Sequence, residues 1–539
     1  MALPNRNNPY SFDEFLQWRN SVDFYADDSF FQKVVKHFTG DEFDEIDREA
    51  RALSEKVSFR WRDMSDAIAA PEKRPYMVHY DAHNHRIDRI VRPRETEIME
   101  KEVFSEGLYS DRTSPWLKLV KMYLIYQNGE ACIACPVTCT EGLVALLERY
   151  ADSPELKRIL RHCKEGIDGD FAIGAQYLSE IQGGSDVPAN LLEAVKEGDT
   201  WRLYGTKFFC SATHADYAVV TAKPADSEKV AIFIVPSWLP GDKEKEIRNG
   251  YTIDRIKWKT GTSELTTAEI TYNGAVAYPA GPLERGVANV VGIVLTFSRL
   301  TVGLSSASFM VRAVREAKKY SELRDAFGLK IGQFPMVVGQ LNHLERVARR
   351  TTVGAFKLYD LVRQLPGGLM GGIVTDEAED IRRRRFDVRE LIMLQKITTA
   401  YDTPDVIRMA LSIFGGHGVI EDFSCLPRLY RDAAVNELWE GPRNVLLAQI
   451  HRDLQRVRDW YPPTEFVENL LQGVDPVIVK EFAEEMDELV NYPSLFQLDE
   501  KTIEVCGRWD NLCHRFFHAY QDRALDEVEE AIAEGVKAQ

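Results

Sequence analysis

The sequence predicts a mainly α-helical protein with a central β domain and a further helical extension at the C-terminus. Residues 1–170 keep apolar side chains at helical spacing, as in TEGLVALLERYADSPELKRILRHC. Residues 171–282 change to short β-branched and aromatic runs, which Gly, Pro, Asp and Asn turns separate. Helical periodicity returns in residues 283–458 and continues through residues 459–539. We therefore expect four units with these bounds.

The charge distribution argues against nucleic acid as a partner. The 539 residues carry a net charge of −17, and from residue 461 onward 18 acids face only 6 bases. Free nucleic acid and anionic membranes both require basic surfaces. We find no run of eighteen apolar residues, so we expect no membrane span. The N-terminal residues lack the pattern of a signal peptide, which predicts a cytoplasmic location.

The elements after residue 170 follow from composition. WRLYGTKFFCSATHADYAVVTAK, KVAIFIVPSWLP and TTAEITYNGAVAYP are typical of strands, and we expect a compact antiparallel, barrel-like domain. Residues 297–328 then read as one long helix with small residues on one face, which favours close helix packing. YPPTEF, which begins at Tyr461, interrupts the helices and opens the acidic helical tail.

Three of the eight cysteines lie close together in ACIACPVTCT, as Cys132, Cys135 and Cys139. The spacing admits an iron–sulfur interpretation, but no nearby fourth cysteine completes a ligand set. The residues between them are apolar, so we favour buried core thiols and expect no metal site.

The stretch VNELWEGPRN places one carboxyl group, Glu440, between the large ring of Trp439 and the tight Gly441–Pro442 pair. A dry pocket under an indole raises a carboxyl pKa toward neutrality, as a general base requires. An exposed acid that a helix dipole stabilises is the alternative from the residues alone.

Three further stretches offer polar groups and glycines. QYLSEIQGGSDV, from Gln176, places hydroxyls and exposed amides in one turn after a strand, which suits a flat or phosphorylated ligand or an ordinary turn. RDAFG offers Arg324 at a helix end, either as a phosphate ligand or as a surface residue. FGGHGV contains His417, an acid–base residue by type and more often a structural one in such a loop.

Taken together, these pieces resemble the acyl-CoA dehydrogenase family from about Tyr80 to Leu454. SEIQGGSD fits the flavin loop of the family, KFFCS fits its adjoining strand, and RDAFG and SIFGGHG fit two later motifs. RDAAVNELWEGP fits its final motif without a gap, although Ser412 and Pro335 depart from the usual residues. The sequence is most similar to the AidB-type branch, which also has an enlarged N-terminal region and a C-terminal extension.

The resemblance implies a helical–β–helical fold, FAD as cofactor, and a role for Glu440 as the general base. Some members carry this base on the long helix beside a conserved arginine, but Ser298 stands there next to Arg299. The implied substrate contacts are Ser185, Arg299 and Gly441. The implied FAD contacts are Leu178, Ser179, Gly184, Ser185, Phe209, Ser211, Arg324, Phe327, Gly416, Pro442 and Asn444. Among these, Arg324, Phe327 and Gly416 would reach the FAD of a neighbouring subunit.

The implied reaction is α,β-desaturation of a small, branched or cyclic acyl-CoA, an activity of fatty acid metabolism. Glu440 would take the α-proton, flavin N5 would receive the β-hydride, and electron-transferring flavoprotein would accept the electrons. The backbone N–H of Glu440 and a flavin hydroxyl would bind the thioester carbonyl. The resemblance also implies a homodimer or homotetramer.

Two alternatives stay open. AidB-type proteins are associated with DNA binding through a basic C-terminal surface, whereas the corresponding tail here is strongly acidic. Only local clusters such as Arg382–Arg385 would favour that role. A flavin-bearing protein that serves only as an assembly partner is the second alternative, and the retained Glu440 and Arg299 argue against it.

Overall fold

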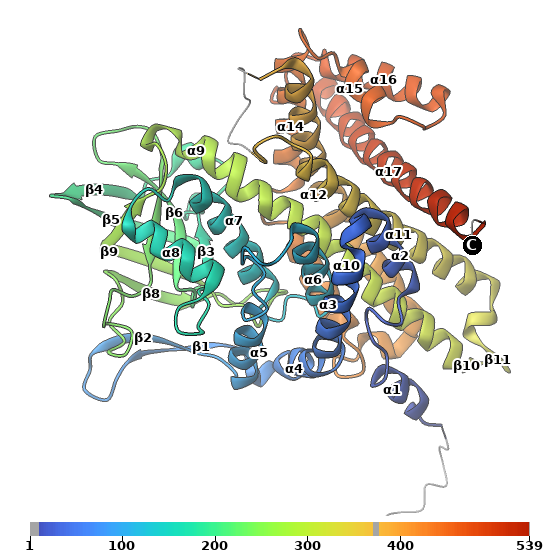
Figure 1. The fold of residues 1–539 in the computed structure, drawn as a ribbon, viewed down its shortest axis with the longest axis horizontal. Coiled ribbons are helices and arrows are strands. Elements are labelled where there is room, and N and C mark those ends of the chain that lie inside the picture. Colours follow the sequence, from blue (N-terminus) through green and yellow to red (C-terminus); the bar gives the residue numbers. More distant parts are fainter. Residues whose placement is uncertain (1–9, 370–376, 538–539) are drawn as a thin grey trace, which may run out of the picture.

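The computed structural model describes residues 10–369 and 377–537 and has the predicted fold class. A β domain lies at one side of the molecule, long helices cross its centre, and the C-terminal helices cover its outer edge (Figure 1). The predicted division at residues 170, 282 and 458 stays a prediction. The stretch LPGGLMGG predicts a loop at Leu365–Gly372, and its residues from Met370 onward lie outside the described part of the chain.

The N-terminal region is helical with one unexpected hairpin. Its helices are α1 (Asp13–Arg19), α2 (Ser29–Thr39), α3 (Phe43–Glu55), α4 (Arg62–Ile68), α5 (Arg94–Phe104), α6 (Pro115–Tyr126), α7 (Ala134–Tyr150) and α8 (Pro154–Glu165). The antiparallel strands β1 (Tyr76–Tyr80) and β2 (Arg86–Val91) interrupt them. Asn84 makes the turn with a φ of 65°, a left-handed conformation that Asn tolerates better than most residues.

The central domain is a closed sheet, as the predicted barrel-like shape requires. Its strands are β3 (Gly174–Tyr177), β4 (Glu193–Glu197), β5 (Thr200–Ser211), β6 (Tyr217–Pro224), β7 (Ala231–Pro236), β8 (Tyr251–Ile256) and β9 (Thr267–Pro279). Strand β6 pairs with both β4 and β7, which closes the ring through β5 and β9. The antiparallel prediction was wrong for two pairings, because β6 runs parallel to β3 and β4. The long connections between these strands allow a parallel crossover.

The C-terminal bundle is built on two long helices. Its elements are α9 (Gly286–Asn289), α10 (Leu295–Leu323), β10 (Asp325–Ala326), β11 (Leu329–Lys330), α11 (Pro335–Arg363), α12 (Glu379–Phe414), α13 (Leu426–Asn436) and α14 (Arg443–Val457). A Cβ on Gly303 of α10 would lie 2.1 Å from the Gln395 amide of α12, which confirms the predicted close packing. The helix ends at Leu323 rather than Gly328, because Arg324 already has an extended backbone, with φ −75° and ψ 122°.

The acidic tail packs on the bundle of its own chain. Its helices are α15 (Pro463–Leu470), α16 (Pro476–Val490) and α17 (Glu500–Lys537). Lys357 Nζ of α11 lies 2.7 Å from Glu527 Oε2 of α17, and an Arg346 nitrogen lies 2.8 Å from Asp522 Oδ1. Part of the negative charge of the tail is therefore matched by basic side chains of the same chain.

One described helix is long and apolar enough to cross a membrane by length and composition. It runs from Leu283 to Leu323 and includes α10, and 67% of its most apolar window is buried inside the protein. This burial is the behaviour of a core helix, which the contacts of α10 with α11, α12 and α7 also indicate.

Candidate active site

The Glu440 carboxyl group lies in the turn between α13 and α14. Its Oε1 accepts a hydrogen bond of 2.8 Å from Gln176 Nε2 of β3, and its backbone carbonyl accepts one of 2.9 Å from Arg299 Nε of α10. Glu440 itself has a φ of 60°, which is uncommon for a residue other than glycine. Such strain persists only where the surroundings fix the backbone.

Lys396 and Gly441 fix this turn. Lys396 Nζ of α12 donates to the carbonyls of Glu437, at 2.8 Å, and of Gly441, at 2.7 Å. Gly441 has a φ of 99°, and a Cβ there would lie 3.0 Å from Leu446 Cδ2. Only glycine meets both conditions comfortably, so the tight pair after Glu440 holds the carboxyl group rigidly, as the sequence indicated.

Burial raises the pKa of Glu440 to about 7, although Arg299, Lys396 and the Gln176 hydrogen bond oppose the rise. This direction agrees with the prediction of a dry pocket beside Trp439. Burial also lowers the pKa of Arg299 to about 10 and that of Lys396 to about 7. A carboxyl group poised near neutrality can accept a proton and release it again.

A small cavity of about 30 Å³ adjoins this carboxyl group. Its walls come from α7, α10, α13 and the Glu440 turn, and the lining residues are Glu130, Ala134, Cys135, Thr138, Cys139, Val302, Ser305, Phe309, Asn436, Trp439 and Glu440. Glu440 Oε2 is buried and has no hydrogen-bond partner among the described residues. The free oxygen and the cavity together make room for a reacting group.

The first group of predicted FAD residues lies on the loop after β3 and on β5. Leu178 is buried, Ser179 and Ser211 are half-buried, and Ser185 is exposed. The Phe209 ring is 52% exposed although it belongs to a strand. An exposed aromatic ring beside hydroxyl groups suits a planar heterocycle.

Gly184 allows two segments of this loop to lie close together. A Cβ on Gly184 would lie 2.1 Å from Ser179 Oγ, so only glycine lets the two backbone segments approach this closely. The approach forms a compact cradle of amides and hydroxyls at the sheet edge. The residues of this group therefore fit a flavin.

The support of the flavin loop was missed in the sequence. Lys207 Nζ, fully buried, donates to the Leu178 carbonyl at 3.0 Å and to Glu180 Oε1 at 2.8 Å. Glu180 also accepts from the backbone N–H groups of Leu191 and Leu192. Burial lowers the pKa of Lys207 to about 8, while Glu180 opposes the shift. Both residues stand inside the motifs quoted above, but their pairing depends on the folded sheet.

The second group of predicted FAD residues, Arg324, Phe327 and Gly416, lies elsewhere. Phe327 is 98% exposed in the β10–β11 hairpin, and no other described group lies within 4 Å of a Cβ placed on Gly416. The hairpin is at the opposite end of the molecule from the β domain (Figure 1). One chain therefore does not bring both groups together.

The remaining predicted residues surround the Glu440 turn. Arg299 is buried and binds the Glu440 carbonyl, Pro442 caps α14, and Asn444 is exposed in its first turn. Ser298 Oγ lies 3.1 Å from Gln176 Nε2, the same nitrogen that binds Glu440. Gln176 and Lys396 were not singled out from the sequence, and only proximity in the fold gives them a role. His417 Nδ1 lies 3.0 Å from the Tyr320 hydroxyl, a contact that favours the structural interpretation.

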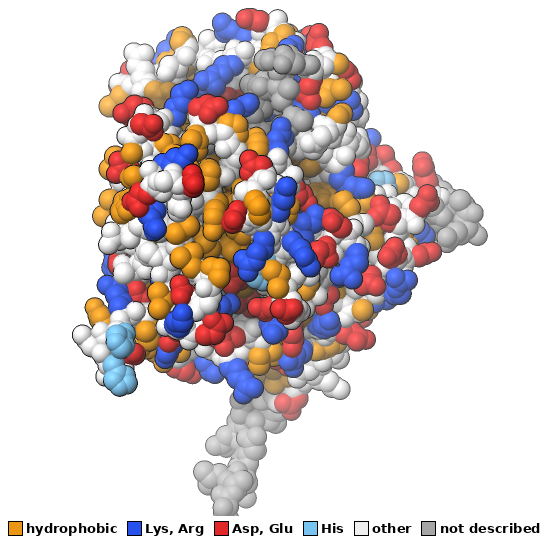
Figure 2. Space-filling model, turned by 60° about the vertical axis from the view of Figure 1, so that its left-hand side comes forward, with side chains coloured by type: hydrophobic (Ala, Val, Ile, Leu, Met, Phe, Trp, Pro, Cys, Tyr) orange, Lys and Arg blue, Asp and Glu red, His pale blue; other side chains and the backbone are white. Residues whose placement is uncertain are grey.

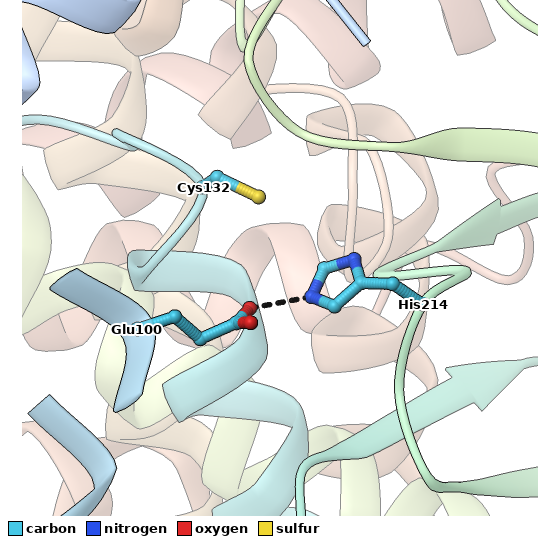
Figure 3. A group of neighbouring side chains, drawn as sticks. All are labelled: Glu100, Cys132 and His214. Carbon is cyan, nitrogen blue, oxygen red and sulfur yellow. Dashed lines mark hydrogen bonds and ion pairs between the residues drawn. The ribbon is translucent and has the colours of Figure 1, made fainter. Parts of the chain in front are cut away.

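The cysteines divide between two surroundings. Cys135 and Cys139 line the cavity with their sulfur atoms 3.7 Å apart, while Cys132 points toward Glu100 and His214 (Figure 3). All three thiols are buried, as predicted. A Glu–Cys–His group could hold a metal by residue type. However, Arg92 engages both oxygens of Glu100, and His214 Nε2 lies 2.5 Å from one of them. The guanidinium would repel a cation, so this cluster is a closed ion-pair network.

The arginine cluster of α12 offers little to a phosphate backbone. Arg383, Arg384 and Arg385 pair with nearby carboxylates, and the Arg382 guanidinium lies 3.8 Å from the Trp460 ring centroid. On the face that Figure 2 draws, basic and acidic side chains are interspersed. This arrangement gives the nucleic-acid alternative no continuous basic surface on that face.

Comparison with known proteins places these features in context. The family model of the acyl-CoA dehydrogenase middle domain matches residues 175–275 of this chain. The family model of the acyl-CoA dehydrogenase C-terminal domain matches residues 284–455. Acyl-CoA dehydrogenase family member 11 of Caenorhabditis elegans is 27% identical over 401 residues, which cover 70% of this chain and 62% of the worm protein. The putative acyl-CoA dehydrogenase AidB of Escherichia coli K12 is 25% identical over 404 residues, which cover 71% of this chain and 69% of AidB.

Solved structures share the fold. The crystal structure of C. elegans ACDH-11 in complex with C11-CoA matches with a TM-score of 0.77 and 22% identity, over 93% of this chain and 86% of that one. The acyl-CoA dehydrogenase of Bacillus anthracis complexed with FAD matches with a TM-score of 0.63 and 17% identity, over 79% of this chain and 76% of that one.

Proposed function

Because this chain belongs to the acyl-CoA dehydrogenase family, we propose that it is an FAD-dependent enzyme that desaturates a small, branched or cyclic acyl-CoA. One observation carries the proposal. Glu440 presents a buried carboxyl oxygen that has no hydrogen-bond partner among the described residues and lies beside a cavity, and its pKa is about 7.

Glu440 acts as the base. Gln176 holds Oε1, so Oε2 is the oxygen that takes the α-proton of the thioester. The backbone N–H of Glu440 polarises the thioester carbonyl, which makes the α-proton more acidic. The cavity volume of about 30 Å³ supports a small acyl group. FAD, when bound, supplies the acceptor for the β-hydride.

FAD is held by residues from two subunits. Ser179, Gly184, Ser185, Phe209 and Ser211 hold it in one protomer, and Arg324, Phe327 and Gly416 contact it from the partner. The separation of the two groups in one chain supports a homodimer or a dimer of dimers. Electron-transferring flavoprotein as the acceptor and a cytoplasmic location complete the proposal.

The test is an anaerobic titration of the FAD-bound protein with a panel of short, branched, aromatic-derived and cyclic acyl-CoA thioesters. Loss of flavin absorbance with one thioester, abolished in Glu440→Gln, is the expected result. Glu421→Gln, which changes an exposed carboxyl group, serves as the control and bleaches like the wild type. No bleaching across the panel, with FAD bound, would exclude the proposed activity for these substrate classes.

A further inference from the structure

The cavity beside Glu440, which would receive the acyl group, is more polar than an alkyl chain requires. Among its eleven lining residues are Glu130, Thr138, Ser305, Asn436 and Glu440, and none is Lys or Arg. The hydroxyl groups of Ser305 and Thr138 already make hydrogen bonds within the protein. Ser305 Oγ donates to the Val302 carbonyl at 3.0 Å, and Thr138 Oγ1 lies 3.2 Å from the Tyr126 hydroxyl.

Two other residues of the cavity lining carry buried nitrogen donors that find no acceptor among the described residues. Asn436 Nδ2 and Trp439 Nε1 are buried, and neither has a hydrogen-bond partner within residues 10–369 and 377–537. The Asn436 side chain belongs to a residue that is only 3% exposed. Buried donors without partners are rare, because they lose their hydrogen bonds to water and gain none in return. Two of them belong to residues that line one cavity, which favours a ligand that supplies acceptors.

Glu130 adds a carboxyl group to the lining of the cavity. Its backbone N–H donates to Asp432 Oδ2 at 3.2 Å, and Asp432 lies one helical turn before Asn436 on α13. Glu130 Oε1 accepts from the Cys135 N–H at 3.2 Å. Burial, together with Asp432, raises the pKa of Glu130 to about 8, although the Cys135 N–H and Lys259 oppose the rise, and this direction favours the uncharged form.

Building on the proposed function, we propose that the acyl group of the substrate carries an uncharged oxygen substituent, best a hydroxyl, which Asn436, Trp439 and Glu130 bind. A hydroxyl oxygen accepts from the amide and the indole, and its proton faces the Glu130 carboxyl group. An acyl group that ends in a carboxylate fits poorly, because a buried carboxylate needs a counterion and the lining residues include no Lys or Arg.

The cavity has room for water before substrate binds, since a volume of about 30 Å³ holds roughly two water molecules. An acyl chain expels this water, and an unsubstituted chain leaves the donors bare. Each bare donor then costs about tenfold in affinity. Discrimination in favour of an oxygen-bearing chain follows.

The experiment compares thioesters of one chain length on the FAD-bound protein: pentanoyl-CoA, 4-hydroxypentanoyl-CoA, 5-hydroxypentanoyl-CoA and glutaryl-CoA. Calorimetry gives the dissociation constants, and flavin absorbance is followed separately. At least one hydroxylated thioester binds about tenfold or more tightly than pentanoyl-CoA, and glutaryl-CoA binds most weakly. Asn436→Leu and Trp439→Phe each reduce the preference for the hydroxyl, whereas Ser305→Ala keeps it.

Equal affinities for the plain and hydroxylated thioesters would overturn the inference, as would a preference that survives both Asn436→Leu and Trp439→Phe. If pentanoyl-CoA bleached the flavin and all these thioesters bound with equal affinity, the proposed dehydrogenase activity would stand and only the inferred hydroxyl group would be wrong. If the hydroxylated thioesters bound more tightly but none bleached the flavin, the inferred ligand class would stand and the proposed desaturation would be wrong. The two failures are therefore distinct.

Discussion

The raised pKa of Glu440 has a cost in stability that Glu440→Gln should relieve. The unfolded chain ionises this carboxyl near pH 4.5, whereas the folded chain does so at about 7. Between these values the folded state holds a proton that the unfolded state has released. Wild-type stability therefore falls as the pH rises through this window, and the uncharged glutamine has no such dependence.

The size of the effect follows from the shift. About 2.5 pKa units at about 1.36 kcal/mol each give roughly 3 kcal/mol above pH 7. Unfolding entropy of about 2.1 cal/mol/K per residue gives roughly 1.1 kcal/mol/K for this chain. The melting temperature of Glu440→Gln should thus exceed that of the wild type by about 3 °C at pH 8.5, with little difference at pH 4.5.

The assay is differential scanning calorimetry of both proteins with FAD bound, in steps from pH 4.5 to 8.5. The difference between the two melting temperatures removes the effects of titrating groups that do not interact with Glu440, whereas Lys396 and Arg299 titrate together with it. A gap that opens between pH 4.5 and 7 and then levels off is expected. A gap of constant size, or one that closes as the pH rises, would refute the assignment of a raised pKa to Glu440.

Three further substitutions probe the scaffold. Gly184→Ala should weaken FAD retention by about tenfold or more, measured by fluorescence of released flavin, because the new Cβ meets Ser179 Oγ. Lys207→Met should destabilise the protein by about 3 kcal/mol in calorimetry, since it leaves Glu180 buried without its cation; an unchanged melting temperature would contradict this. Gly303→Val should lower the melting temperature by several degrees through overpacking between α10 and α12, and wild-type melting would show that the contact can relax.

Local sequence signals predicted the fold order and the tight turn after Glu440. Strand-like runs after residue 170 and helical periodicity after residue 283 depend on neighbours in the chain, so they could be read directly. The Glu440 turn was predicted for the same reason, because Trp439, Gly441 and Pro442 adjoin it. The β1–β2 hairpin was missed, since its turn lacks the glycine that usually marks a hairpin.

Long-range contacts could not be predicted in this way. Gln176 reaches Glu440 across 264 positions of the chain, and nothing near Gln176 announces that partner. Lys207 lies 27 positions from Glu180 and would be expected to point to solvent in an alternating strand. The buried donors of Asn436 and Trp439, for which the described part of the chain offers no partner, can be recognised only in the folded cavity.

The most direct test of the central claim measures removal of the α-proton itself. The FAD-bound protein is incubated with a saturated acyl-CoA in D₂O, without electron acceptor, and mass spectrometry follows deuterium entering the α-carbon. The account predicts exchange in the wild type, with a rate that rises with pH through about 7, and its loss in Glu440→Gln although the thioester still binds. Equal exchange in both proteins would show that another group removes the proton and would contradict the account.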